Sequence, residues 1–438
     1  MTGPGEGTRH VMHVGFFPEI LDHVDVSRDL LSVLLHQRAA DETAPGISLR
    51  LARLQPVDVP HRLNNNDYDD FYPEFQAGAE KIAEQLGAPQ AVVGLYEHTV
   101  VPAARLRERF NLPGTSVDTA LNCRDKVRMK HLVAQAGVAV PQWLDLAGAT
   151  GERIRSWLNS RPGRWVIKPK SEGGAVGVQI VDNPTAGLAA ISRIPAAELN
   201  RYEVEEFVEG EIFHLDAVVR DATISFHSLS RYLNSCHDSS VHRLPLASIT
   251  VTDGELVAGA REVADRCVSA LGIADAVIHL ELFRSAGEWI FLEIACRHGG
   301  AAVVPHLQEI FGVDLLDESY RANVLDPSLV PPAREQTPLR PEHACSAWLL
   351  APMKASGQFT VTAVHPPEDV PGIVSARLPE AGDVVTDEFR PFPHLGVFIL
   401  AGADEETVRR DIHQVLATYR VDLQSVPATS VPLAEEIG

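Results

Sequence analysis

The sequence predicts a multidomain protein of mixed α/β and α+β class, with an N-terminal parallel α/β domain and a small β-rich C-terminal domain. Strand and helix patterns alternate over the first 115 residues, which is typical of a parallel sheet. From Arg164 onward, strand patterns follow one another at hairpin spacing, which favours antiparallel sheets. The length of 438 residues and the prolines between 327 and 341 indicate further division. We therefore expect domains at 1–115, 116–330 and 331–438.

Within the first domain, residues 11–17 (VMHVGFF) form an apolar run that predicts a buried strand. Residues 28–38 have apolar positions at helical spacing and predict a helix. An amphipathic helix is expected at 74–86, with Gly87 as its C-cap, followed by a strand at 91–95. Strand, helix and strand in this order predict a small parallel unit.

The rest of the chain is expected to begin with a helix at 116–135, for which Ser116 or Asp118 supplies the N-cap. The strands expected after it are 164–169, 175–181, 202–208, 212–219, 223–232, 276–284 and 289–296, with helices at 185–192 and 256–271. The last unit, from 342 onward, combines short strands with a final helix near 405–419.

Charge and composition exclude several functional classes. The 59 acidic and 38 basic residues give a net charge of −21, and no long run of Lys or Arg interrupts this, so a nucleic-acid partner is not expected. No apolar run reaches the roughly 20 residues needed to span a bilayer, so no membrane association is expected. The five cysteines form no C-x-x-C pair, and the N-terminus lacks signal-peptide features. A cytoplasmic protein without zinc or disulfide bonds is the expectation.

A glycine-rich segment, WVIKPKSEGGAVGVQIV, is the first motif that carries chemistry. A predicted strand ends at Lys168, and a loop with Gly173, Gly174 and Gly177 follows it. Glycines let backbone N–H groups approach phosphate oxygens closely, and a lysine adds positive charge. A hairpin turn with a solvated lysine explains the segment equally well.

The second motif is a hairpin, VIHLELFR followed by WIFLEIACR. If Ser285 lies opposite Trp289, then Glu281 lies opposite Glu293. Two facing carboxylates repel each other unless a cation lies between them, and this favours a Mg²⁺ site over a solvated sheet face. Alternation assigns Leu280, Leu282, Ile290, Leu292, Ile294 and Cys296 to the core, and His279, Glu281, Phe283, Phe291, Glu293, Ala295 and Arg297 to the opposite face.

Three shorter segments are less specific. Arg297 precedes His-Gly-Gly and suits a carboxylate or acyl phosphate, but it is nearly as well explained as an ion-pair partner of Glu293. In RYEVEEFVEG, Phe207 and Val208 could flank an adenine while Glu209 or Glu211 binds the ribose; from the residues alone, an exposed acidic strand end is the simpler reading. Lys126, at the start of a helical segment, is by itself an ordinary surface residue.

Residues for a second substrate are harder to choose. His214 and Asp216 share one face of a predicted strand, and His227 and Arg231 alternate similarly on the next. They could line an acceptor site, and a solvated sheet edge is an equally good reading. Residues 233–245 are a candidate substrate loop.

Taken in order, these segments from about Leu112 to Gly300 resemble the ATP-grasp superfamily. The resemblance implies an ATP-grasp fold with a lid subdomain at about 140–206. It also implies the following roles: Lys126 and Lys168 on the ATP phosphates, Gly173, Gly174 and Gly177 in the phosphate lid, Glu205, Glu206, Phe207, Val208 and Glu211 at the adenine and ribose, Glu281 and Glu293 as metal ligands, and Arg297 over an acyl phosphate. Many members have Glu-x-Asn-x-Arg where this chain has Glu293-Ile-Ala295-Cys-Arg297, so a water or a bidentate Glu293 must replace the asparagine.

The Arg-x-Gly-Gly ending and the extra C-terminal unit look most like L-amino-acid ligases and related carboxylate–amine ligases. That resemblance implies ATP with Mg²⁺ or Mn²⁺, and small carboxylate and amine substrates such as amino acids. Joined through an acyl phosphate, they would give an amide, ADP and phosphate. The alternatives are an ATP-grasp carboxylase of the biotin-carboxylase type and a non-catalytic ATP-binding regulatory protein. The sequence leaves open whether the chain forms a homodimer.

Overall fold

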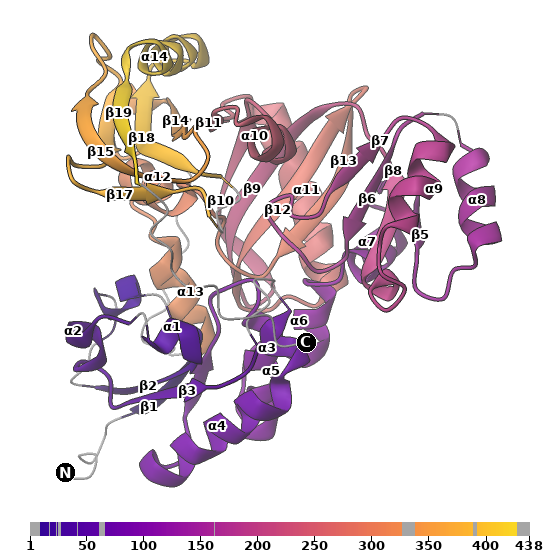
Figure 1. Cartoon of the computed structure of the whole chain (residues 1–438), viewed down its shortest axis with the longest axis vertical. Coiled ribbons are helices and arrows are strands. Elements are labelled where there is room, and N and C mark those ends of the chain that lie inside the picture. Colours follow the sequence, from indigo (N-terminus) through magenta and orange to yellow (C-terminus); the bar gives the residue numbers. More distant parts are fainter. Residues whose placement is uncertain are drawn as a thin grey trace.

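The computed structural model describes residues 9–426, apart from 17, 23, 25–27, 42, 61–65, 162, 326–337 and 389–391. Figure 1 shows the N-terminal sheet at the bottom, a small sheet on the right and the C-terminal strands at the upper left, arranged around a large central sheet. Among the described residues, no helix is both long and apolar enough to cross a membrane. Most of the proline-rich segment, including Pro327, Pro331 and Pro332, lies outside the described residues.

The N-terminal sheet is parallel and has the strand order β3-β2-β1-β4. Its elements are β1 (Arg9–Val14), β2 (Asp29–His36), β3 (Arg53–Val57), β4 (Ala91–Val93), α1 (Gln37–Asp41), α2 (Pro45–Ser48), α3 (Asp67–Asp70), α4 (Tyr72–Leu86) and α5 (Val100–Arg109), with a 3₁₀ turn at Pro18–Asp22. The strand expected at 11–17, the helix at 74–86 with Gly87 at its C-cap and the strand at 91–95 are confirmed within a few residues. The helix predicted at 28–38 is wrong, because those residues form β2.

The reason for this error is burial on both faces. Strand β2 pairs with β1 on one side and β3 on the other, and all but one of its residues are buried. A strand covered on both faces is apolar almost throughout, so its sequence loses the alternation that separates strands from helices.

The predicted helix at 116–135 is two helices, α6 (Val117–Asn122) and α7 (Lys126–Gln135). The Ser116 hydroxyl caps α6 by accepting from the Thr119 N–H, as predicted. The Asp125 carboxylate then caps α7 by accepting from the N–H groups of Val127 and Arg128. This second cap makes Lys126 the first residue of α7, where the Lys126 N–H donates to the Lys170 carbonyl at 3.0 Å.

A four-stranded antiparallel sheet, here called the lid sheet, has the order β5-β8-β6-β7. It comprises β5 (Trp143–Asp145), β6 (Trp165–Pro169), β7 (Gln179–Val181) and β8 (Tyr202–Glu206), with helices α8 (Gly151–Asn159) and α9 (Pro184–Ser192) packed beside it. In Figure 1 the lid sheet lies next to β13. Strand β7 is shorter than predicted, because residues 175–178 belong to the glycine loop.

The central sheet has eight strands in the order β13-β12-β9-β10-β11-β14-β18-β16. These are β9 (Glu211–Arg220), β10 (Thr223–Tyr232), β11 (Leu246–Thr250), β12 (Ala276–Ser285), β13 (Glu288–Ala295), β14 (Cys345–Pro352), β16 (Ile373–Arg377) and β18 (His394–Gly402), with α10 (Cys236–His242), α11 (Gly254–Leu271), α12 (Val303–Phe311) and α13 (Leu315–Val324). Helices α7 and α11 cover one face of β9, β12 and β13, and α12 packs on the other face of the sheet. Helix α13 also packs against the N-terminal sheet, through Leu316, Tyr320 and Val324.

The C-terminal segment is joined to the central sheet, because β14, β16 and β18 are three of its strands. The remaining strands, β15 (Gln358–His365), β17 (Val384–Thr386) and β19 (Arg420–Ser425), form a separate antiparallel sheet. Helix α14 (Glu405–Thr418) confirms the final helix expected near 405–419, and β19 follows it without having been predicted.

Candidate active site

A pocket of about 420 Å³ is lined by strands of both the lid sheet and the central sheet. Its lining includes Lys126, Arg164, Lys168, Glu172, Gly173, Glu205, Glu206, Phe207, Val208, Glu209, Tyr232, Cys236, Asp238, Glu281, Phe283, Leu292 and Glu293. Most residues selected from the sequence therefore meet in one cavity. Four of them, Gly174, Gly177, Glu211 and Arg297, are outside the pocket wall.

The glycine loop connects β6 to β7 and contributes to the pocket wall. Gly174 and Gly177 have φ values of 62° and 72°, the left-handed region that favours glycine. At Gly177 a Cβ atom would lie 2.9 Å from the Pro169 side chain, so space also requires glycine there. Gly173 lines the pocket, and a Cβ at this position would lie 3.8 Å from Nη2 of Arg297. Nη2 of Arg297 therefore lies close to a residue of the pocket wall.

Lys168 is not solvated, which rules out the alternative of a simple hairpin turn with an exposed lysine. Its ammonium group is buried and donates to Oε1 of Glu205 at 2.5 Å. Lys130, which is fully buried, donates to Oε2 of Glu203 at 2.7 Å and to Oε2 of Glu205 at 2.5 Å. Two lysines and two glutamates thus form a buried ion cluster.

The charges in this cluster hold one another ionised. Burial alone would raise the pKa of Glu205, but Lys130 and Lys168 lower it to about 2. The two glutamates raise the pKa of Lys168 above its usual value despite its burial. Both oxygens of Glu205 accept hydrogen bonds from lysines, so Glu205 holds Lys168 in place at the pocket wall. Sequence analysis missed Lys130 and Glu203. Lys130 lies four residues after Lys126 in α7, and Glu203 lies two residues before Glu205 in β8. Each therefore shares a face with a selected residue, and this spacing could have identified it.

The segment after β8 forms one end of the pocket. The Arg164 guanidinium lies 3.8 Å above the Phe207 ring and pairs with Glu209. The Glu206 carboxylate accepts from the Gln142 N–H at 3.0 Å. Glu211 is exposed and pairs with Arg231 at 2.8 Å, outside the pocket wall.

The β12–β13 hairpin confirms that Glu281 lies opposite Glu293, but the turn that leads to this pairing is not the predicted one. Ser285 lies opposite Glu288 and not Trp289. The pairing then skips Leu292 in a bulge, which restores the register at Glu281.

The bulge also changes which residues face the pocket. Phe291, predicted on the same face as the glutamates, is 0% exposed in the core formed with α7 and α11. Leu292, predicted in the core, lines the pocket, as Phe283 does. Both assignments were wrong because one extra residue reverses the alternation on the turn side of a strand.

Glu281 and Glu293 fit a hard divalent cation such as Mg²⁺ or Mn²⁺, since they are facing carboxylates at the pocket wall. The Lys126 ammonium lies 3.0 Å from Oε2 of Glu293, and the Tyr232 hydroxyl donates to Oε1 of Glu281 at 3.0 Å. Among the described residues, none donates a hydrogen bond to Oε2 of Glu281. Ala295 contributes no polar side-chain atom opposite His279.

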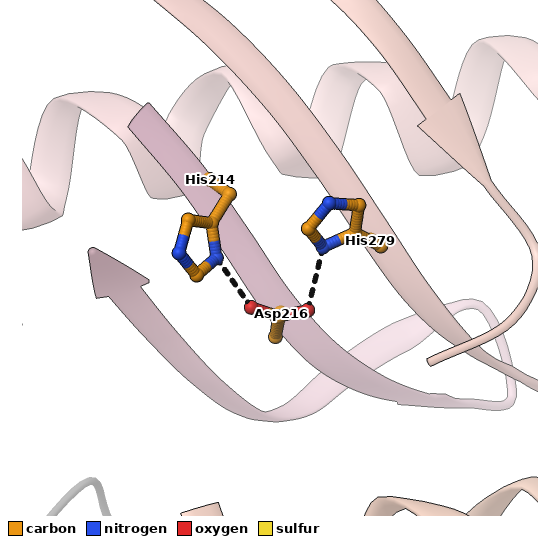
Figure 2. Close-up of side chains that lie close together, drawn as sticks. All are labelled: His214, Asp216 and His279. Carbon is orange, nitrogen blue, oxygen red and sulfur yellow. Dashed lines mark hydrogen bonds and ion pairs between the residues drawn. The ribbon is translucent and has the colours of Figure 1, made fainter. Parts of the chain in front are cut away.

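His214 and Asp216 are not on a solvated edge, because each is 1% exposed. Figure 2 shows the Asp216 carboxylate between two imidazoles, with one oxygen 2.6 Å from Nδ1 of His214 and the other 2.8 Å from Nδ1 of His279. Burial lowers the pKa of His279, but Asp216 and Glu281 outweigh it and raise that pKa to about 10. The other acceptor candidates lie apart: His227 is near Arg261, and Arg231 pairs with Glu211 and Glu405.

Arg297 lies close to Gly173, and its ion pair is with Glu97 and not with Glu293. Its Nε donates to Oε2 of Glu97 at 2.6 Å, and its Nη1 donates to the His298 carbonyl at 2.7 Å. Glu97 also accepts from Arg124 at 3.0 Å. Burial would raise the pKa of Glu97, but Arg297 and Arg124 lower it to about 2. Glu97 follows β4 in the N-terminal sheet, and no local pattern marked it.

The antiparallel lid sheet, the glycine loop, the two pocket lysines and the facing carboxylates together define the ATP-grasp class. The chain has an ATP-grasp fold and resembles the ATP-grasp superfamily. No protein-family model matches it. It is 23% identical over 356 residues to an L-arginine-specific L-amino acid ligase from Bacillus subtilis, covering 77% of this chain and 81% of the relative. It is 24% identical over 404 residues to an alanine–anticapsin ligase from Bacillus subtilis, covering 80% and 81%.

Solved structures resemble most of the chain in fold. An L-amino acid ligase from Bacillus licheniformis matches with a TM-score of 0.72 and 16% identity, over 96% of this chain and 100% of that one. The biotin carboxylase domain of a 2-oxoglutarate carboxylase from Hydrogenobacter thermophilus, solved with MgADP and bicarbonate, matches with a TM-score of 0.69 and 15% identity, over 96% and 92%. At these identities the two structures establish the shared fold.

Proposed function

We propose that this chain is an ATP-dependent carboxylate–amine ligase that joins amino acids through an acyl phosphate and releases ADP and phosphate. The observation that carries the proposal is that Lys126, Lys168 and the facing pair Glu281–Glu293 line one pocket. The two relatives named above are ligases of amino acids, which supports amino acids as the substrate class.

In the proposed reaction, a carboxylate oxygen of the first substrate attacks the γ-phosphorus of ATP. The bond from that phosphorus to the bridging oxygen breaks, and ADP leaves. The amine nitrogen of the second substrate then attacks the acyl carbon. The bond from this carbon to the phosphate oxygen breaks, and the nitrogen loses a proton as the amide forms.

The residues of the pocket would act mainly by positioning and charge neutralisation. Lys126 and Lys168 would face the phosphates, and Phe207 and Val208 would flank the adenine. Mg²⁺ or Mn²⁺ held by Glu281 and Glu293 would neutralise the phosphate oxygens. The loop at Gly173 would cover the phosphates and exclude water, which otherwise hydrolyses an acyl phosphate.

Arg297 is proposed to bind the acyl phosphate. Glu97 and the His298 carbonyl hold its Nε and Nη1 atoms, while its Nη2 atom lies on the side of Gly173. A guanidinium fixed in this way keeps one edge for a carboxylate or phosphate. We also propose domain bounds at 1–115, 116–330 and 331–438, with the lid at about 140–206.

The test is an assay of the nucleotide product with a panel of amino acids. We expect ADP and phosphate, and a hydroxamate when hydroxylamine replaces the amine substrate. Arg297→Lys should lose the hydroxamate, whereas the exposed Arg193→Lys should keep it. AMP and pyrophosphate as the main products would overturn the mechanism.

The fold shared with a biotin carboxylase domain favours one second candidate, in which bicarbonate is the activated carboxylate. In that case, adding bicarbonate should stimulate phosphate release from ATP in the absence of any amino acid. Nucleotide binding with no phosphate release under either condition would instead identify a non-catalytic ATP-binding protein.

A further inference from the structure

The buried triad His214–Asp216–His279 has no role in the reaction described above. His214 and Asp216 are two residues apart on β9, so their side chains share a face, and Asp216 lies directly opposite His279 on β12. The three residues are 1%, 1% and 8% exposed. Burying polar side chains costs free energy unless each polar atom has a hydrogen-bond partner. The partners of the triad therefore indicate what it does.

A metal ion is the first alternative, since one ligand atom from each residue lies within 4.8 Å of the others. The hydrogen bonds argue against it. Both Asp216 oxygens face an imidazole Nδ1, at 2.6 and 2.8 Å. The remaining Nε2 of His214 lies 2.7 Å from the Ser248 hydroxyl, and that of His279 lies 3.4 Å from Oε1 of Glu281. Each imidazole nitrogen therefore already faces a polar partner.

The last of these contacts connects the triad to the pocket. Oε1 of Glu281 faces both Nε2 of His279 and the Tyr232 hydroxyl, whereas Oε2 receives no hydrogen bond from the described residues. The carboxylate is therefore held through one oxygen, which leaves the other for a ligand in the pocket that Glu281 lines. Groups that orient a metal ligand from behind commonly change metal affinity by about 10- to 100-fold.

We propose that the triad is a positioning device for Glu281, in which Asp216 fixes His279 and His279 orients the carboxylate toward a divalent cation. This inference rests on the proposed function, because it takes Glu281 as a metal ligand. His214 and Ser248 complete the device by fixing the other side of Asp216.

Gly299 packs closely against the same group of residues. A Cβ on Gly299 would lie 2.7 Å from Oδ1 of Asp216 and 2.8 Å from Nδ1 of His279, so the loop after Arg297 packs directly on this hydrogen bond. At Gly300 a Cβ would meet nothing within 4 Å. Gly299→Ala should therefore disturb the Asp216–His279 pair, and Gly300→Ala is its matched control.

The experiment measures Mn²⁺ binding to the full chain with saturating ADP, by the electron paramagnetic resonance signal of free Mn²⁺. ADP affinity without metal and thermal unfolding are measured in parallel. An asparagine at position 279 can reach Asp216 but not Glu281, whereas a glutamine places its amide nitrogen near the original Nε2. His279→Asn and Gly299→Ala should raise the Mn²⁺ dissociation constant about 10- to 100-fold. His279→Gln should recover most of the affinity, and Gly300→Ala should match the parent.

The outcomes separate this inference from the proposed function. Glu281→Gln with unchanged Mn²⁺ affinity would overturn the metal site itself. The positioning role alone would be overturned if Glu281→Gln weakens Mn²⁺ binding while folded His279→Asn and Gly299→Ala bind Mn²⁺ as tightly as the parent. If His279→Asn and Gly299→Ala lose as much affinity for metal-free ADP as for Mn²⁺, the triad has only a structural role. Zinc or iron found in the purified parent and lost in Asp216→Asn would overturn it in favour of a second metal centre.

Discussion

Glu281 and Glu293 lie directly opposite each other in the β12–β13 hairpin, and a bulge at Leu292 separates this pair from the turn. The bulge decides the environment of two neighbouring residues. Phe291 points into the core, and Leu292 lines the pocket. Regular alternation without the bulge would exchange these positions.

The bulge therefore predicts different effects for the two residues. Phe291→Ala should lower the free energy of unfolding by about 3–5 kcal/mol, because it leaves a cavity in a closed core. Leu292→Ala should cost less than half as much and should weaken ADP binding. Urea denaturation and calorimetric titration of ADP give both quantities. The opposite ranking of the two stability losses would contradict the bulge and favour a hairpin with regular alternation.

Replacing Glu293 by glutamine should lower ATP turnover at least about 100-fold while leaving the fold intact, because the amide is a poor ligand for a hard cation. The measurement is phosphate release over a range of Mg²⁺ concentrations, with thermal unfolding as the check on folding. Glu288→Gln, at the exposed end of the same hairpin, is the matched control. Full activity of Glu293→Gln at ordinary Mg²⁺ would remove Glu293 from the metal site.

Lys168→Met should have two separable effects. It leaves Glu203 and Glu205 with Lys130 alone, so the free energy of unfolding should fall by about 3–5 kcal/mol. ATP binding should also weaken, because the pocket loses a positive charge. Adding Glu205→Gln should restore much of the stability without restoring ATP affinity. Parental ATP affinity in the single variant would refute the phosphate-binding role of Lys168.

Glu97 predicts a pH dependence of stability. Its pKa in the folded protein is about 2, below the ordinary value of 4.5, because Arg297 and Arg124 outweigh the effect of burial. The ionised carboxylate thus stabilises the fold above about pH 4.5, and this contribution is lost as the pH falls toward 2. Glu97→Gln should be less stable at pH 7 and should lose less stability on acidification.

Urea denaturation at pH 7, 5, 4 and 3 measures this slope. Glu84→Gln, on the exposed face of α4, should keep the parental slope. If Glu97→Gln loses stability between pH 5 and 3 as steeply as the parent, the ion pairs of Glu97 do not stabilise the fold.

The sequence by itself determined the features that depend on near neighbours in the chain. The amphipathic pattern of α4, the Ser116 cap and the hairpin with two facing glutamates were predicted, because side-chain periodicity and capping act over a few residues. Lys168 at a strand end before a glycine loop was likewise readable. The resemblance to the ATP-grasp superfamily added functional roles that no single segment predicts by itself.

Only the tertiary structure decided the features that depend on pairing between distant segments. Strand β2 was predicted as a helix because its cover on both faces comes from other parts of the chain. The Lys130–Glu203 pair joins residues 73 positions apart, the Asp216–His279 pair 63, and the Glu97–Arg297 pair 200. A charged residue that will be buried and paired has the same local sequence pattern as one that stays in water. The difference arises when the partner segment arrives and removes the solvent, since burial then penalises any charge left without a partner.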